Sequence, residues 1–277
     1  MEITSTIREM KALRRKCSGS VGLVPTMGYL HQGHIELVKT AKKENPVAVV
    51  SIFVNPTQFA PNEDFRAYPR DINRDLDLLR NAETDIVFIP SVEDMYPRDY
   101  NTWVVVKDIT ERLEGKSRPT HFQGVTTVCS KLFNIVEPHK AYFGQKDAQQ
   151  ALVIQKMVNE LNMNLEIIIA PTVRESNGLA MSSRNTYLDK EERAAAAVLY
   201  KALCLAQDMY REGERDAAKI RSAMTGLISK EPRAIIDYVS IADIQTLHEL
   251  TRIEAKALVS IAVKIGKPRL IDNIILG

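Results

Sequence analysis

The chain has 277 residues, enough for one large domain and a smaller one, because single domains usually contain about 100–200 residues. Hydrophobic residues make up 45% of it and charged residues 26%, which is typical of a globular protein with a sizeable core. Lysine and arginine number 37 against 35 acidic residues, a formal net charge of +2, and the longest basic cluster is the short RRK at 14–16. This balance argues against a nucleic-acid-binding protein.

The three cysteines, Cys17, Cys129 and Cys204, are widely separated and form no CxxC pair. They argue against a disulfide framework or a structural zinc site and fit a reducing compartment. The N-terminus lacks the apolar core of a signal peptide, and the longest apolar run, residues 47–54, is far too short to span a bilayer. We expect a cytoplasmic protein with no membrane partner.

Helical and strand patterns alternate through the first 170 residues. Helical spacing of apolar residues occurs at 3–15, 33–44, 71–81, 124–136 and 149–161. Short apolar runs typical of strands occur at 21–24, 47–54, 86–89, 141–143 and 165–170. Continuous apolar strands between amphipathic helices predict an α/β, Rossmann-like domain over residues 1–174, with a parallel sheet covered on both faces. Such sheets bind ligands at the carboxyl ends of their strands.

The pattern changes after about Arg174. A long alanine-rich helix is expected at 190–211, capped by Asp189, and a second helix at 214–229. Three strand-like runs follow, at 235–241, 257–263 and 270–276. Helices followed by strands predict a smaller α+β domain over residues 175–277, with the boundary region at 172–184.

The segment VGLVPTMGYLHQGH at 21–34 predicts a strand, a tight turn and a helix N-terminus. The unpaired N–H groups and partial positive charge of a helix N-terminus suit a phosphate. Gly28 and Gly33 remove side chains where a nucleotide must come close. His31 and His34 are three residues apart, so both rings face one side of the first helical turn and can donate hydrogen bonds to phosphate oxygens. Such donors stabilise the charge that builds up during attack at phosphorus.

Two other interpretations of His31 and His34 are open. The pair could bind a metal, although no third ligand is evident nearby. The rings could also be structural, which is less plausible for a pair beside a glycine at the mouth of a βα turn. The HxGH pattern after a strand is shared by class I aminoacyl-tRNA synthetases and related nucleotidyltransferases. It therefore indicates adenylyl transfer from ATP.

Two further segments carry candidate phosphate-binding groups. In FGQKD at 143–147, Gly144 permits a close backbone approach and Lys146 supplies a positive charge, while Asp147 is placed to cap a helix. MSSR at 181–184 combines two hydroxyls with a guanidinium and resembles the KMSKS loop of class I synthetases with its lysine positions altered. Its place at the domain boundary is where a lid would hinge.

Neutral amide side chains follow the strongest strand of the chain. Asn55 and Gln58 lie in the segment FVNPTQF, and Gln150 follows FGQKD. Their donors and acceptors suit hydroxyl groups, so together they indicate a pocket for a small hydroxylated acid.

These motifs resemble those of the pantoate–β-alanine ligase family across essentially the whole chain. The segments that carry the resemblance, in order, are PTMGYLHQGH at 25–34, SIFVNPTQF at 51–59, NEDFRAYPRD at 62–71, FGQKDAQQ at 143–150, MSSRNTYL at 181–188 and PRLIDNII at 268–275. The resemblance implies that pantoate attacks the α-phosphate of ATP to give pantoyl adenylate, and that β-alanine then displaces AMP to give pantothenate.

The resemblance also implies roles for individual residues. ATP would be bound by Met27, Gly28, Tyr29, Leu30, His31, Gln32, Gly33, His34, Gly144, Gln145, Lys146, Asp147, Val173, Met181, Ser182, Ser183 and Arg184. Catalytic roles would fall to His34, His31, Lys146 and Arg184. Pantoate and β-alanine would be bound by Gln58, Gln150 and Asn55.

Some expectations rest on the family alone. Tyr29 stands where the family more often has a small residue, and Gln32 where an acidic one is frequent. Magnesium is expected with ATP; its protein ligands are unassigned, with Asp75 a candidate and most ligands coming from ATP and water. A homodimer through the larger domain is expected, with the smaller domain as a lid.

Two other functions compete with the ligase. A different nucleotidyltransferase, such as a nucleotide-cofactor adenylyltransferase, would share HxGH but would not need NPTQF and DAQQ. It would release a dinucleotide rather than AMP. A non-catalytic nucleotide-sensing module would bind ATP without turning over any acid.

Overall fold

The computed structural model describes residues 1–61 and 63–277, so Asn62, the first residue of the NEDFRAYPRD segment, lies outside the described residues. The chain forms two compact units. The first contains Met1–Gln145 and Gln149–Pro171, and the second contains Lys146–Ala148 and Thr172–Gly277. The sequence places the boundary after residue 174, and the two units of the structure divide between Pro171 and Thr172.

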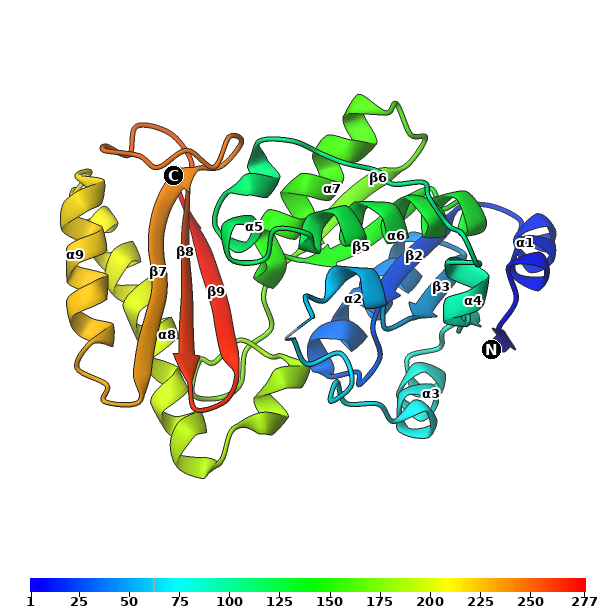
Figure 1. Cartoon of the computed structure of the whole chain (residues 1–277), viewed down its shortest axis with the longest axis horizontal. Coiled ribbons are helices and arrows are strands. Elements are labelled where there is room, and N and C mark those ends of the chain that lie inside the picture. Colours follow the sequence, from blue (N-terminus) through cyan, green and yellow to red (C-terminus); the bar gives the residue numbers. More distant parts are fainter. Residues whose placement is uncertain (62) are drawn as a thin grey trace. The chain divides into compact units, whose positions relative to one another are not determined.

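The first unit is built on a six-stranded sheet whose neighbouring strands all run parallel (Figure 1). Its strands are β1 (Glu2–Thr4), β2 (Val21–Thr26), β3 (Val47–Ile52), β4 (Ile86–Phe88), β5 (Lys140–Gly144) and β6 (Glu166–Ala170). Their order across the sheet is β1-β4-β3-β2-β5-β6. The predicted Rossmann-like domain with a parallel sheet is confirmed.

Helices and short 3-10 turns (η) connect these strands. They are α1 (Ile7–Lys16), α2 (Gln32–Glu44), η1 (Pro56–Gln58), α3 (Ile72–Asn81), α4 (Val92–Met95), η2 (Ile109–Glu111), α5 (Glu114–Ser117), α6 (His121–Val136), η3 (Gln145–Asp147) and α7 (Ala148–Glu160).

The sheet is buried on both faces, as its uninterrupted apolar strands predict. Val24 of β2 and Val50 of β3 pack in one cluster with Val38 of α2 and Leu79 of α3. Leu23, the neighbour of Val24, is also fully buried and points to the opposite face. Each such side chain contributes roughly 1.5–3 kcal/mol on burial, which holds the strand ends at fixed positions.

The start of the chain differs from its predicted structure. Residues 3–15 have helical spacing, but residues 2–4 form β1, in register with β4 through Ile3 opposite Val87. The helix begins only at Ile7, because the Thr6 side chain accepts a hydrogen bond from Glu9 N and caps it. Tertiary pairing with β4 therefore overrides the helical pattern of the first residues.

The strand order reverses between β2 and β5. From β2 the chain continues outward through β3 and β4 on one side, and β5 and β6 lie on the other side. Parallel α/β sheets bind ligands in the crevice outside the strand ends at such a reversal. The segments that follow the carboxyl ends of β2 and β5 are HQGH and GQKD, so two candidate motifs follow the strands at this point.

The second unit contains an antiparallel sheet in the order β7-β8-β9, with two long helices. The elements are η4 (Ser183–Tyr187), α8 (Lys190–Arg211), α9 (Ala217–Ile228), β7 (Ala234–Asp243), β8 (Ala257–Ile265) and β9 (Arg269–Leu276). Asp189 caps α8 as predicted, accepting from Glu192 N while the Glu192 side chain accepts from Asp189 N. The predicted α+β fold of this region is confirmed. Every helix in the described parts of the chain is too short or too polar to cross a lipid bilayer.

Candidate active site

A turn with two left-handed residues joins β2 to α2. Gly28 has φ 81° and Tyr29 has φ 49°, and the Thr26 hydroxyl accepts a hydrogen bond from Gly28 N. A Cβ at Gly28 would lie 3.0 Å from Ile52 and 3.1 Å from Asp75 Oδ2, so glycine fits both the backbone angle and the space. The positive φ at Tyr29 is unfavourable for a bulky residue.

Asp75 of α3 holds the main chain of this turn by hydrogen bonds. Its two carboxylate oxygens accept hydrogen bonds from Tyr29 N and Leu30 N, both at 2.7 Å, and the residue is 1% exposed. Burial raises the pKa of Asp75, although the two N–H donors act to lower it. The carboxylate already has both oxygens bonded to the main chain, which argues for a structural support rather than the magnesium ligand considered from sequence.

His31 and His34 lie together at the start of α2. His31 is the N-cap, and its Nδ1 accepts from Gly33 N at 3.2 Å, while His34 Nδ1 accepts from His31 N at 3.3 Å. The ring centroids are 4.0 Å apart. Because each Nδ1 accepts a main-chain N–H, the proton of each neutral ring resides on Nε2. The helix start therefore holds two adjacent Nε2–H donors, as the three-residue spacing predicts.

Side chains from the ends of β2 and β3 meet beside this turn. Gln58 of η1 donates through Nε2 to Met27 Sδ at 3.1 Å, and its Oε1 accepts from Asn55 Nδ2 at 3.1 Å. Asn55 is 1% exposed and also donates to Gly124 O and accepts from Thr57 N. The structure thus brings Met27, Gln58 and Asn55 together, and it gives Asn55 the additional role of capping η1.

Two side chains, from the start of α6 and from the segment before it, hold the main chain at Gln58, and Glu63 holds one of them. Arg118 forms a two-pronged ion pair with Glu63 at 2.6 Å and donates to Gln58 O at 3.1 Å. His121 Nδ1 lies 2.9 Å from the same carbonyl, and its Nε2 lies 3.2 Å from Arg118 Nη1. We call Arg118, Glu63 and His121 the Gln58 clamp. None of the three belongs to the residues expected from sequence.

The hydrogen bonds of the Gln58 clamp fix the protonation state of His121. Arg118 can only donate, so His121 Nε2 must accept, and Nδ1 carries the proton and donates to Gln58 O. The ring is therefore neutral. Burial, together with the Arg118 charge, lowers the pKa of His121 to about 4. Burial acts to raise the pKa of Glu63, but the Arg118 fork outweighs it and holds that pKa below its usual value.

The carboxyl end of β5 offers open space beside its backbone. A Cβ at Gly144 would meet no atom within 4 Å, which fits the predicted close approach of a ligand. The following residue, Gln145, is the last residue of the first unit before the chain enters the second unit. Gln150 belongs to the first unit again and lies, half-buried, on α7. Lys146 and Asp147 belong to the second unit, where Lys146 Nζ is 3.6 Å from Asp147 Oδ1.

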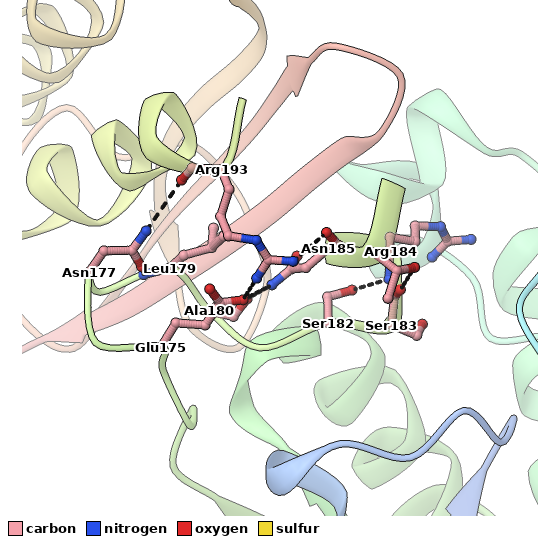
Figure 2. A network of polar contacts seen from close by, with 10 residues as sticks. Glu175, Asn177, Leu179, Ala180, Ser182, Ser183, Arg184, Asn185 and Arg193 are labelled. Carbon is pink, nitrogen blue, oxygen red and sulfur yellow. Dashed lines mark hydrogen bonds and ion pairs between the residues drawn. The ribbon is translucent and has the colours of Figure 1, made fainter. Parts of the chain in front are cut away.

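The other candidates of the second unit lie on one braced arm, residues 173–181, and the turn that follows it. Met181 N donates to Val173 O at 2.9 Å, which closes the arm as a narrow hairpin. Further along the arm the Glu175 carboxylate accepts hydrogen bonds from Asn185 and Arg193 (Figure 2).

The turn after this arm carries the MSSR segment. Ser182 caps η4 by accepting from Arg184 N at 3.3 Å. Figure 2 shows the Arg184 side chain extending away from the Glu175 network.

The sequence candidates divide between the two units. The first contains Met27, Gly28, Tyr29, Leu30, His31, Gln32, Gly33, His34, Asn55, Gln58, Gly144, Gln145 and Gln150. The second contains Lys146, Asp147, Val173, Met181, Ser182, Ser183 and Arg184. Sequence reasoning gave no role to the Gln58 clamp, and it gave none to PRLIDNII although that segment was among the motifs.

Comparison with known proteins decides the family. The model of the family described as pantoate-beta-alanine ligase matches residues 2–275. A pantothenate synthetase of Herpetosiphon aurantiacus is 57% identical over the full length of both chains. The crystal structure of pantothenate synthetase from Thermus thermophilus superposes with a TM-score of 0.95 at 45% identity, covering 99% of each chain.

The chain belongs to the pantoate–β-alanine ligase family. It is a ligase that joins pantoate to β-alanine for pantothenate biosynthesis. A further structural relative, from Francisella tularensis, has a TM-score of 0.80 at 36% identity and covers 99% of this chain and 97% of its own. The structure of that relative is a complex with beta-gamma ATP and beta-alanine.

Proposed function

We propose that this ligase works through a pantoyl adenylate. In the first step a pantoate carboxylate oxygen attacks the α-phosphorus of ATP, the bond to the β-phosphate oxygen breaks, and pyrophosphate leaves. In the second step the neutral amine of β-alanine attacks the acyl carbon, the bond to the AMP oxygen breaks, and a proton passes to solvent. The products are pantothenate, AMP and pyrophosphate.

The observation that carries this proposal is the histidine pair at the start of α2. Two Nε2–H donors, 4.0 Å apart by ring centroid, stand at a helix N-terminus that follows the strand at the sheet's reversal. Negative charge accumulates on the α-phosphate oxygens as pantoate attacks. Fixed donors and the helix N-terminus stabilise that charge more strongly in the transition state than in bound ATP.

Further residues take the roles that their positions allow. Gln58 and Gln150 would orient pantoate, with Asn55 fixing Gln58. Lys146 and Arg184 would neutralise the phosphates, while the open space at Gly144 admits the nucleotide. Support for ATP and β-alanine as substrates comes from the Francisella tularensis relative, whose structure is a complex with beta-gamma ATP and beta-alanine.

The test is pantoate-dependent exchange between ATP and labelled pyrophosphate. His34→Ala should lower the exchange rate about 10²-fold, because one donor to the developing charge is lost. The variant should still convert supplied pantoyl adenylate and β-alanine to pantothenate at close to the wild-type rate, because the histidines serve the first step. His248→Ala, a histidine of the second unit far along the chain, is the matched control and should leave exchange unchanged.

Two results would contradict the proposal. Absence of exchange by the wild-type enzyme with pantoate present would exclude the adenylate. Unaltered exchange by His34→Ala, with its thermal stability intact, would remove His34 from the first step.

Magnesium is proposed to enter with ATP. Among the described residues no group of three or more His, Cys, Asp or Glu side chains is placed to hold a metal ion, and Asp75 has both oxygens on the main chain. Such a site fits a cation held by phosphate oxygens and water, where it would neutralise phosphate charge. Exchange should stop when EDTA is added and return with Mg²⁺.

We also propose a homodimer through the larger unit. The segment 101–107 is extended, belongs to no strand, and exposes 41% of Trp103 and 57% of Val105. Exposed apolar side chains at alternate positions of an extended segment favour contact with a second copy. Light scattering should give the mass of a dimer, and Val105→Asp should lower it; a monomeric wild-type chain would contradict this.

The three free cysteines support the proposed cytoplasmic location.

A further inference from the structure

The segment PRLIDNII belongs to β9, and two of its side chains are polar and buried. Asp272 is 2% exposed and Asn273 is 3% exposed. Successive residues of a strand point to opposite faces of the sheet, so these two side chains reach different parts of the second unit. Burial of these two polar side chains requires hydrogen-bond partners for both.

Asp272 anchors the arm that leads to the MSSR segment. Its carboxylate accepts from both Arg174 nitrogens, Nη1 at 2.5 Å and Nη2 at 3.0 Å. Arg174 also donates to Gly178 O at 3.1 Å and packs 4.2 Å over the Tyr200 ring. The arm is therefore tied to β9 through Arg174, directly beside Val173, and the same guanidinium also holds Gly178 O near the tip of the arm.

Asn273 reaches the other candidate segment. Its Nδ2 donates to the main-chain carbonyl of Lys146 at 2.9 Å. Lys146 lies in η3, a single 3-10 turn that leads directly into α7, and 3-10 turns have poorer hydrogen-bond geometry than α-helices. The bond from Asn273 is thus a substantial constraint on where the Lys146 side chain begins.

We propose that Asn273 is a positioning residue for adenylation. It fixes the Lys146 main chain and thereby the position from which the Lys146 ammonium meets the ATP phosphates. The arm that Asp272 anchors is held by the same strand. Asn273 touches no reacting atom and acts only through Lys146. The inference rests on the proposed role of Lys146 in phosphate binding.

The chain offers a matched control on the neighbouring strand. Ser260 of β8 is the register partner of Asn273, is 6% exposed, and its hydroxyl has no hydrogen-bond partner in the structure. Ser260→Ala therefore removes a buried polar atom at the paired position of the neighbouring strand, and it leaves the hydrogen bond between Asn273 and Lys146 in place.

The test is a double-mutant cycle in the full-length enzyme, measured as kcat/KM for ATP in pantoate-dependent exchange. Asn273→Ala should lower this value about fivefold to tenfold, the usual effect of one lost hydrogen bond. In a Lys146→Ala background the same change should have less than about a twofold effect, because the ammonium that Asn273 positions has been removed even though the main-chain carbonyl remains. Ser260→Ala should have no effect in either background.

Hydrogen–deuterium exchange supplies a readout that does not depend on activity. The peptide covering residues 145–148 should exchange faster in Asn273→Ala and at the wild-type rate in Ser260→Ala. If Asn273→Ala does not fold, Asn273→Leu fills a similar volume without a donor and replaces it.

Three results would overturn the inference. They are an equal loss from Asn273→Ala in both backgrounds, an unchanged kcat/KM in the folded variant, and unchanged hydrogen exchange at 145–148. A wild-type enzyme without exchange activity would contradict the proposed function instead, and the hydrogen exchange of 145–148 would then decide on Asn273 alone.

Discussion

The neutral, buried ring of His121 makes the stability of the first unit depend on pH. His121 is 8% exposed and donates to Gln58 O while accepting from Arg118. A second proton would place an N–H on Nε2 directly against the Arg118 guanidinium. The folded protein therefore resists protonation that the unfolded chain accepts readily.

The size of the effect follows from the two pKa values. Burial lowers the pKa of His121 from 6.5 to about 4. Between these values the unfolded chain binds a proton that the folded protein does not, so stability falls as the pH is lowered and is constant above about pH 7. Linkage gives a loss of about 2 kcal/mol between pH 7 and pH 5, and about 3 kcal/mol in all.

The assay is urea unfolding followed by tryptophan fluorescence. Trp103 is the only tryptophan in the chain and lies in the same unit as His121, so its signal reports on that unit. His121→Gln can keep both hydrogen bonds without titrating, and should show about 2 kcal/mol less pH dependence than the wild type between pH 7 and pH 5. His248→Gln should keep the wild-type dependence. Equal pH dependence in the wild type and His121→Gln would refute the neutral, buried ring.

Two further substitutions test the supports of the site. Asp75→Asn turns an N–H donor toward the main-chain N–H groups of the turn, so it should lower the free energy of unfolding by about 1–3 kcal/mol and slow ATP–pyrophosphate exchange. Asp77 is exposed on the same helix, and Asp77→Asn should have neither effect. Gly124→Ala places a Cβ 2.5 Å from Thr57 O, and should destabilise by about 1–3 kcal/mol in urea unfolding. Gly226→Ala, a helical glycine with open space around it, should instead be neutral or stabilising; equal effects of the two glycine changes would contradict the packing of α6 on η1.

Local patterns in the sequence were enough to predict most elements. Apolar runs and helical spacing predict both the parallel sheet and the smaller α+β unit, because strands buried on two faces and helices buried on one leave different periodicities. The paired rings of His31 and His34 follow from a three-residue spacing in one helical turn. The strand β1 was missed because its pairing with β4 lies about eighty residues away and leaves no local pattern.

The supports of the site could not be predicted because they join residues far apart in the chain. Arg118 is 60 positions from the Gln58 carbonyl that it holds. Asn273 is 127 positions from the Lys146 carbonyl. Nothing in the spacing of a lone Arg or Asn distinguishes such a partner from a solvated surface residue. Asp75 is the opposite case, a residue to which the sequence suggested the wrong kind of role. A carboxylate near a nucleotide-binding motif resembles a metal ligand until its main-chain partners are known.

Three buried ionisable groups of this ligase share one arrangement, which affects how its variants must be interpreted. Asp75 bonds the turn before His31, His121 bonds the carbonyl of Gln58, and Asp272 bonds the arm beside Val173. Each of these buried groups holds backbone or a neighbouring side chain next to a candidate site residue. Changing any of them would lower activity by moving that neighbour, and a single variant would resemble loss of a catalytic group. Only a cycle with the supported residue separates the two, because a positioning residue loses its effect once the residue that it positions has been removed.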